Sequence, residues 1–231
     1  MPPIALPPAT LLPFGNQWTA NGGALSRTPP NSSGELGSVI DAAVGDALAV
    51  MLGGLGIVVP NSTSLVPAVP DCVEVGPVRV VGGVRPQNFD VGYRPDGVRV
   101  AFDSKTLNDR KSVGKNYQNM INDLATEATT VHSRFPSAVV GFIVAIPEPC
   151  LPAGSLANAL IGTLTRLGGR TLVDEAPHRA EALSLVVWDP ATGNISPTTP
   201  DPTSPLRLER FSERVELTYH DRFQGLPPHA A

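Results

Sequence analysis

The sequence predicts an α/β fold, because segments with helical and with strand-like apolar patterns alternate along it. Residues 34–52 and 112–132 repeat apolar residues at helical spacing, whereas 72–81, 87–105 and 138–146 carry the apolar runs or alternation of strands. In chain order these segments give helix, three strands, helix, strand. At 231 residues the chain is long enough to bury a sizeable core around them.

The first helix has clear start and stop signals. It follows Ser32-Ser33-Gly34-Glu35 and ends at Gly53-Gly54. The spacing of Ser32 and Glu35 fits a capping box, in which the glutamate side chain bonds to the backbone N–H of the cap residue. We expect Asp41 and Asp46, on the same helix, to be solvated.

Residues 87–105 predict a β-hairpin. Alternate positions on each strand are apolar and share one face, namely Phe89, Val91 and Tyr93, then Val98, Val100 and Phe102. Between the strands, Arg94-Pro95-Asp96-Gly97 supplies the proline and glycine of a short turn. A four-residue loop would set Asp90 directly opposite Asp103. The face opposite the apolar one then holds Asp90, Arg99, Asp103 and Lys105.

The rest of the chain adds extensions to this core. A helix is predicted over 155–167, a strand over 182–188 and a proline-rich link over 194–205. Ser204-Pro205 then starts a final helix, on which a salt-bridged surface explains the alternating arginines and glutamates better than a DNA-binding face does. We expect a proline-rich arm over 1–32, a core domain over 33–192, and a link with a C-terminal helix over 193–231.

Composition excludes some classes of function but does not indicate a particular one. The formal charge of −4 argues against a general nucleic-acid coat protein. Two cysteines, Cys72 and Cys150, are too few for a disulfide framework or a four-cysteine metal site, and we expect both to be small buried hydrophobes. The N-terminus is broken by prolines and lacks a positive region, so it is not a secretory signal, and a cytoplasmic protein is expected. Its apolar residues favour docking of the irregular arm on the domain.

The hairpin carries a pattern suited to metal chemistry. Asp90 beside Asp103 would destabilise a sheet by like-charge repulsion, and a divalent cation removes that objection. Mg²⁺ takes carboxylate and carbonyl oxygens, so Asp90, Asp103 and the backbone carbonyl of Ser104 could bind it. Lys105 would point at the same space and orient an attacking water. The alternative is an exposed hairpin with a solvated charged face.

These residues resemble the signature of the PD-(D/E)XK nuclease superfamily. The signature is an acid on one strand, then Asp or Glu, any residue and Lys on the next, here Asp90 followed by Asp103-Ser104-Lys105. The element order over 33–147 is similar as well. The resemblance implies a restriction-endonuclease-like αβββαβ core with a central mixed sheet flanked by helices, and Mg²⁺ as cofactor with Mn²⁺ as a substitute. The family's first acid often follows proline, as Asp96 does here, but we favour Asp90 because a strand holds a ligand rigidly.

Two helical residues also match the superfamily in part. Members often carry an acid on the first core helix that joins the metal site, which would be Glu35 here. Capping explains Glu35 fully, so we weigh it ahead of metal binding. Gln118 resembles a glutamine that some members place near the metal.

The segment after Lys105 is polar and mostly basic, and we expect it to contact DNA. Arginine and lysine neutralise phosphate charge, while amide side chains offer hydrogen bonds. The candidates are Arg110, Lys111, Lys115, Asn116, Gln118 and Asn119. The alternative for each of them is an ordinary solvated residue at the start of a helix.

The resemblance implies a Mg²⁺-dependent endonuclease that hydrolyses DNA phosphodiester bonds, and we expect a type II restriction endonuclease cutting specific sites in double-stranded DNA. No membrane contact or nucleotide cofactor is expected, and a homodimer would read a palindromic site. A repair, structure-selective or phage nuclease fits the same residues. So does a non-catalytic DNA-binding or assembly module with this fold, or an unrelated α/β domain in which Asp90 and Asp103 lie far apart.

Overall fold

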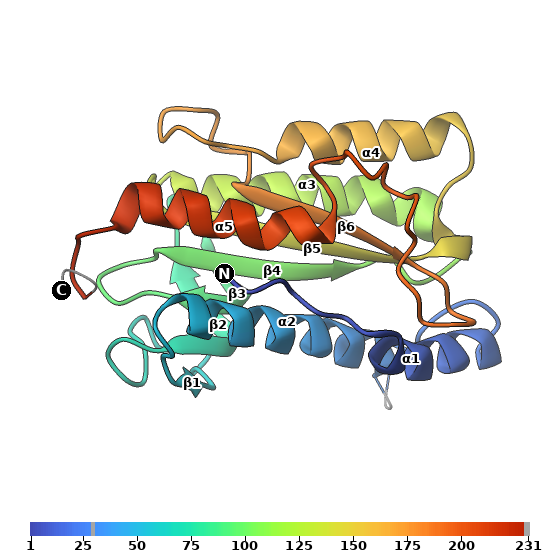
Figure 1. Ribbon diagram of the computed structural model, residues 1–231, viewed down its shortest axis with the longest axis horizontal. Helices are drawn as coiled ribbons and strands as arrows, with labels where there is room; N and C mark the ends of the chain where they lie inside the picture. The colour runs from blue at the N-terminus through green and yellow to red at the C-terminus, as the bar shows by residue number, and fades with distance from the viewer. Residues whose placement is uncertain (29–30, 229–231) are drawn as a thin grey trace.

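A computed structural model shows an α/β protein built on one six-stranded mixed sheet with helices on both faces (Figure 1). The structure describes residues 1–28 and 31–228. Residues 29–30 and 229–231, which belong to the predicted arm and tail, lie outside the described residues.

The helices and strands follow the order predicted for the core. The helices are α1 (Pro8–Ala20), α2 (Ser32–Met51), α3 (Val113–His132), α4 (Ser155–Leu167) and α5 (Leu208–Phe223). The strands are β1 (Ile57–Val58), β2 (Val73–Val81), β3 (Pro86–Tyr93), β4 (Val100–Thr106), β5 (Val139–Pro147) and β6 (Ala182–Trp188). Helix α2, the three strands β2 to β4, helix α3 and strand β5 therefore succeed one another as the apolar patterns predict, with the short β1 added.

The sheet changes from antiparallel to parallel at β4. Its strands lie in chain order from β1 to β6; β2, β3 and β4 pair antiparallel, whereas β4, β5 and β6 pair in parallel. Parallel neighbours need a crossover, and α3 and α4 supply the two that join β4, β5 and β6. Both β5 and β6 are buried along their whole length, which explains their uninterrupted apolar sequences.

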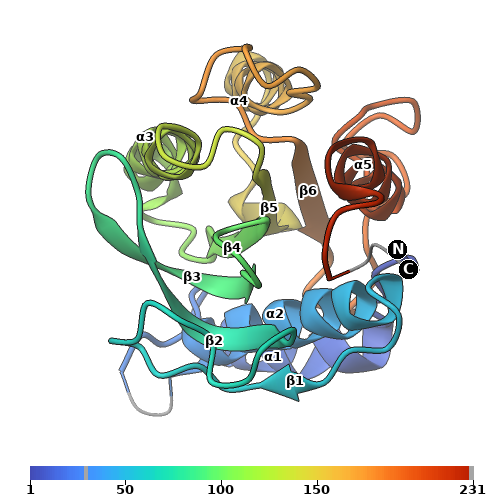
Figure 2. The same cartoon turned by 90° about the vertical axis from the view of Figure 1, so that its left-hand side faces the viewer.

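Helices cover the two faces of the sheet in pairs. Figure 2 shows α2 and α5 on one side and α3 and α4 on the other. Helix α2 packs on β2, β3 and β4, and α5 packs on β5 and β6. In Figure 1 strand β4 ends at the right of the molecule, where α2 and α3 both begin. Residues at the end of β4 therefore lie between the starts of two helices on opposite faces.

The predicted hairpin register is confirmed, with a longer turn. Val91 pairs with Phe102 and Tyr93 with Val100, so the next pair in line joins Asp90 and Asp103. Strand pairing ends at Tyr93, whose carbonyl accepts a hydrogen bond from the N–H of Arg99 at 2.9 Å. The connection thus spans 94–99 instead of four residues.

The N-terminal arm is more ordered than the sequence suggests. Its proline-rich composition predicts an irregular extension, but the first proline of Pro8–Ala20 stands in the first turn of α1, where a missing N–H costs nothing. Leu11, Phe14 and Trp18 are buried, and α1 packs on α2. The Trp18 indole donates a hydrogen bond to the carbonyl of Asn108 at 2.7 Å, which joins the arm to the segment that follows β4.

The capping box predicted for α2 is wrong. Asn31 is the N-cap, and its side chain accepts a hydrogen bond from the N–H of Gly34 at 3.1 Å. The hydroxyl of Ser32 instead accepts from the N–H of Ser26 at 3.1 Å. Asparagine satisfies the free N–H groups of a first turn as well as serine does. Ser32 is therefore not needed as the cap, and its hydroxyl joins the preceding segment to the helix.

A buried ion cluster fastens α3, β5 and α5 to the start of β6. Glu181 is fully buried, and its two oxygens accept hydrogen bonds from Arg170, Arg222 and His132 and from the N–H of Val140. Burial would raise the pKa of Glu181, but these donors and charges outweigh it and lower the pKa. All the acceptor capacity of this carboxylate is thus used inside the protein.

The C-terminal helix has the salt-bridged surface, and the cysteines have the burial, that the sequence predicts. Helix α5 begins at Leu208, three residues after Pro205, and the pairs Arg207–Glu209 and Arg210–Glu213 lie along its surface. Cys72 and Cys150 are buried and free. Within the described residues, no helix is long and apolar enough to cross a membrane.

Candidate functional site

Asp90 and Asp103 lie where β3 and β4 separate. The last pair of the ladder is Val91 with Phe102, and beyond it the Asp90 carboxylate fills the gap between the strands. It accepts a hydrogen bond from the N–H of Ser104 at 2.9 Å and another from the Ser104 hydroxyl at 3.3 Å. Asp103 is close enough to share a hydrogen bond with Asp90. The two acids therefore meet across the strands, as the register predicts.

Lys105 is held by two acids beneath α3. Its ammonium donates to Asp103 Oδ2 at 2.8 Å and to Glu127 Oε1 at 2.8 Å. Glu127 sits on α3 and is buried. The sequence gives a weak signal for it, because Glu127 lies on the apolar stripe between Leu124 and Val131, where an acid needs a partner.

Helix α2 brings a third acid, Asp41, to the same place. One face of its first turns carries Gly34, Gly37, Ser38 and Asp41, which are spaced three or four residues apart. A Cβ atom on Gly37 would lie 3.3 Å from the Ser104 hydroxyl, so the small residues keep this face open. Asp41 is only 9% exposed, and the expectation that it is solvated is therefore wrong, whereas Asp46 is exposed as expected.

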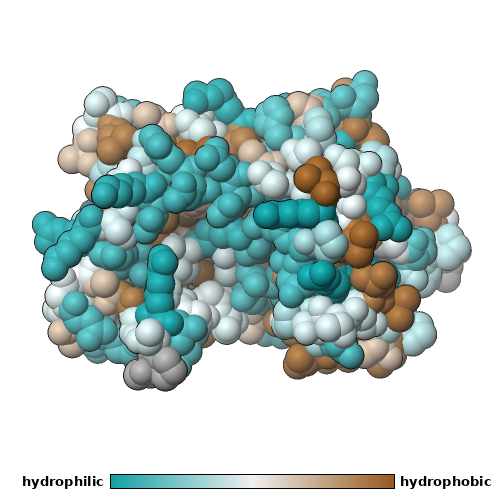
Figure 3. Space-filling model, turned by 180° about the vertical axis from the view of Figure 1, so that it is seen from behind, coloured by the Kyte–Doolittle hydropathy of each residue, from teal (hydrophilic) through white to brown (hydrophobic). Residues whose placement is uncertain are grey.

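These acids line one cavity of about 500 Å³. Its walls come from α2, the segment before it, and the strands β3 and β4; they are formed by Arg27, Asn31, Ser33, Gly34, Gly37, Ser38, Asp41, Asp90, Asp103, Ser104 and Thr106. Seen from behind in Figure 3, hydrophilic side chains gather over the left half of the molecule, the end at which β4 terminates. A polar substrate would therefore meet few apolar side chains there.

Burial and mutual repulsion raise the pKa values of acids in this cluster. Burial first, and then the charge of Asp90, raises the pKa of Asp41 to about 8. The pKa of Asp103 is raised well above its ordinary value by burial and by the nearby Glu127 and Asp90, although Lys105 opposes this. Burial also raises the pKa of Glu127. Without a cation, the cluster therefore retains protons that ordinary carboxyls lose.

The pKa of Lys105 is shifted in the direction that keeps its ammonium charged. Burial alone would lower the pKa of its ammonium, but the charges of Asp103 and Glu127 outweigh burial and raise the pKa. The lysine is consequently a permanent cation at neutral pH.

The other predicted ligands lie away from the cavity. Asp96 is in the turn at the opposite end of the hairpin, where it forms an ion pair with Arg99. Glu35 is exposed in the first turn of α2 and does not line the cavity. The hairpin is not an exposed one with a solvated charged face, because Asp103 is only 7% exposed.

The predicted DNA contacts lie in the turn after β4 and at the start of α3. Arg110 and Lys111 lie in the turn before α3, and the other four occupy its first two turns. All are exposed except Asn116, which is half-buried and donates to the Ser112 hydroxyl at 2.8 Å. None lines the cavity; its arginine is Arg27, which precedes α2 and gives no motif signal in the sequence.

The donor set suits a hard divalent cation. Among the described residues, Asp41 Oδ1 is buried without a hydrogen-bond partner, and Asp41 lines the same cavity as Asp90 and Asp103. Oxygen ligands of this kind are those that Mg²⁺ prefers. Over the described part of the chain, no three acidic, histidine or cysteine side chains already surround one ion position. A cation would draw the three carboxylates together from where they stand.

Asp41 should make the protein less stable as pH rises. Its pKa is about 8 in the folded chain against an ordinary value of 3.8, so the folded state binds more protons between these values. The free energy of unfolding therefore falls as pH rises from 3.8 to about 8. Asp41→Asn removes this loss, and urea denaturation in a metal chelator should find the variant more stable than wild type by more than about 1 kcal/mol at the alkaline end.

The matched control is Asp46→Asn, which removes an exposed acid from the same helix. It should change stability little at either end of the range. If Asp41→Asn lowered the free energy of unfolding by the same amount at acid and at alkaline pH, the result would contradict the raised pKa of Asp41.

Comparison with protein-family models, with curated proteins and with solved structures returned no match. The geometry of the carboxylate cavity and its lysine is therefore the basis for assigning a function.

Proposed function

We propose that this protein is a Mg²⁺-dependent endonuclease that hydrolyses DNA phosphodiester bonds, built on a restriction-endonuclease-like core. One observation carries the proposal: Asp41, Asp90 and Asp103 line a single cavity, and Lys105 is bonded to Asp103 at its edge. Like charges packed this closely cost stability unless a cation binds between them. An unrelated fold that mimics the motif would instead keep Asp90 and Asp103 apart.

Asp41, Asp90 and Asp103 would hold the Mg²⁺ ion, together with the backbone carbonyl of Ser104. The ion, when bound, would stabilise charge on a phosphate and lower the pKa of a water. We assign the helical acid to Asp41 instead of Glu35, because Asp41 faces the cavity. The Ser104 N–H holds Oδ2 of Asp90 in place, which orients this carboxylate for a cation.

Lys105 acts as a charged donor in this proposal. Its ammonium remains protonated between Asp103 and Glu127, so it orients a water or offsets charge on the phosphate and does not abstract a proton. Glu127 is a positioning residue, since it touches the lysine but does not line the cavity. When Asp103 turns toward a cation, Glu127 still holds the lysine in place.

Duplex DNA is the proposed substrate, and a type II restriction enzyme is the proposed kind of nuclease. The exposed Arg110, Lys111 and Lys115 lie at the end of the molecule where β4 terminates and can neutralise phosphates on either side of the cut. Asn116, Gln118 and Asn119, on the same turns of α3, offer amide groups for base edges. Two copies related by a twofold axis would cut both strands of a palindromic site.

Cleavage should depend on both Mg²⁺ and Asp103. Supercoiled plasmid and long linear duplex DNA, incubated with the protein and Mg²⁺, should give discrete fragments that are absent in a chelator. Asp103→Asn keeps the size of the side chain but removes a ligand and the partner of Lys105, so cleavage should fall by more than about 100-fold.

Glu35→Gln is the control, because it changes an exposed acid on α2 that does not line the cavity. It should cleave at the wild-type rate. If wild-type protein leaves duplex, branched and single-stranded DNA intact with Mg²⁺ and with Mn²⁺, the proposal fails, and a non-catalytic binding module takes its place.

Glu127→Gln should change the pH dependence of cleavage. Losing one of its two acids lowers the pKa of Lys105, so the fall in rate at alkaline pH should begin at a lower pH, and the rate constant should drop by about tenfold. Asp46→Asn, an exposed change on α2 that does not line the cavity, should leave the profile unaltered. A wild-type profile for Glu127→Gln would show that Glu127 does not position the lysine.

A further inference from the structure

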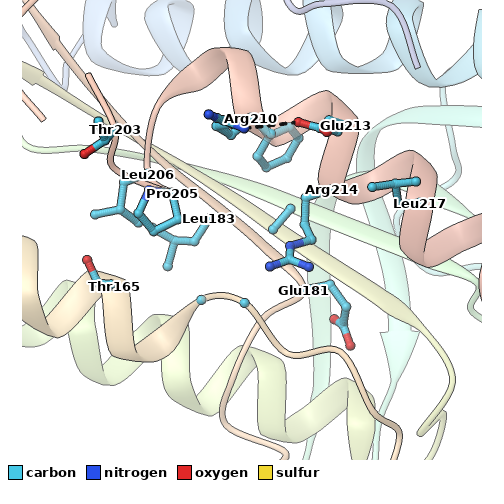
Figure 4. A pocket seen from close by; sticks show the side chains of 14 residues that line it. Thr165, Glu181, Leu183, Thr203, Pro205, Leu206, Arg210, Glu213, Arg214 and Leu217 are labelled. Carbon is cyan, nitrogen blue, oxygen red and sulfur yellow. Dashed lines mark ion pairs between the residues drawn. The ribbon is translucent and has the colours of Figure 1, made fainter. Parts of the chain in front are cut away.

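A second cavity lies between α4, the start of β6 and α5 (Figure 4). Its volume is about 380 Å³, within the range of small-molecule sites. It shares no lining residue with the carboxylate cavity. The nuclease proposal therefore gives it no role.

Most of its wall is apolar, and hydroxyl, guanidinium and carboxylate groups complete it. Leu183, Pro205, Leu206, Phe211 and Leu217 supply the apolar surface. Figure 4 shows the hydroxyl residues Thr165 and Thr203 at one end, while the guanidinium of Arg214 extends toward the other. A ligand with an apolar body and one charged group matches this arrangement.

Arg214 brings a positive charge that no acid in the cavity offsets. Within the described residues, its guanidinium forms no hydrogen bond or ion pair, although the side chain is half-buried. The carboxylate of Glu181 also lines the cavity but is already fully engaged by Arg170, Arg222, His132 and the N–H of Val140. Glu213, the other acid in the wall, pairs with Arg210 at 3.7 Å.

A second arginine lies close to Arg214 but is already paired. A Cβ atom on Gly169 would lie 3.7 Å from Nη2 of Arg179 and 3.8 Å from Nη2 of Arg214, so both guanidinium groups approach the same turn. Arg179 pairs with Glu175 on one nitrogen, but its Nε is buried without a partner in the described chain. Arg179 does not line the cavity, and its Nη2 donates to the carbonyls of Gly168 and Gly169, so Arg214 is the cation that remains for a ligand.

We propose that this cavity binds a small organic carboxylate with an apolar body. The carboxylate would accept paired hydrogen bonds from Arg214, the geometry in which guanidinium groups bind such anions best. The chain of the ligand would lie along Leu183, Leu206 and Leu217, and a polar far end could reach Thr165 or Thr203. This inference does not depend on the nuclease proposal.

Octanoate is the probe, titrated into the whole protein by isothermal calorimetry. We expect saturable binding of one octanoate per chain with a dissociation constant in the millimolar range, as suits a ligand of this size. Octanamide has the same length without the charge and should bind at least about tenfold more weakly, since a charged hydrogen bond is lost. Inorganic phosphate, an anion without an apolar body, should also bind at least about tenfold more weakly.

Three variants locate the site. Arg214→Gln should weaken octanoate binding by at least about tenfold, whereas Arg166→Gln, an exposed arginine of α4 outside the cavity, should bind as wild type does. Leu217→Glu, at a position 60% exposed, places an acid one turn from Arg214 and should also weaken binding without unfolding the chain. The proposal is overturned by absence of saturable binding, by equal binding of octanamide or phosphate, or by full affinity in Arg214→Gln.

Discussion

The burial of like charges at the end of β4 is the constraint on which the rest of this structure depends. Asp103 is placed under α3 by the sheet, Asp90 is placed beside it by the hairpin register, and Asp41 reaches the same cavity from α2. Carboxylates in such a place resist ionisation, as the raised pKa values of Asp41 and Asp103 show. The fold accommodates the cluster with one internal cation, Lys105, and leaves room for another.

The helices on opposite faces contribute in different ways. Helix α2 supplies small residues that keep the cavity open and one acid with a buried oxygen that lacks a partner, whereas α3 supplies Glu127, which fixes the lysine from the other side. Successive residues of β4 point to opposite faces, so Ser104 lies toward α2 whereas Asp103 and Lys105 lie toward α3. Asp103 is therefore the residue that the proposed metal site and the lysine share. The N-terminal arm strengthens this end of the molecule, since Trp18 bonds to Asn108 just beyond β4.

Much of the fold could be predicted from the sequence, but the full site could not. Alternation determined the hairpin register, since only one register puts both apolar sets on one face, and that register brought Asp90 to Asp103. Glu127 was missed although its place on the apolar stripe of α3 offered a weak signal, and Asp41 was missed because an acid on an amphipathic helix looks the same whether it faces solvent or a cavity. Which of the two it faces depends on how α2 and α3 cross the sheet, and a one-dimensional pattern does not contain that angle. The capping role of Asn31 was missed because Ser32, its neighbour, has the same chemistry.

Proton release on Mg²⁺ binding tests the central claim most directly. Asp41 holds a proton at neutral pH, because its pKa is about 8, and a cation among the three acids must displace it. Calorimetric titration of Mg²⁺ in two buffers of different ionisation enthalpy measures that proton without any need for DNA. The account predicts saturable binding with at least one proton released per ion at neutral pH, and a smaller release at pH well above 8, where Asp41 is already ionised. Absence of binding, or binding with no proton released, would contradict it.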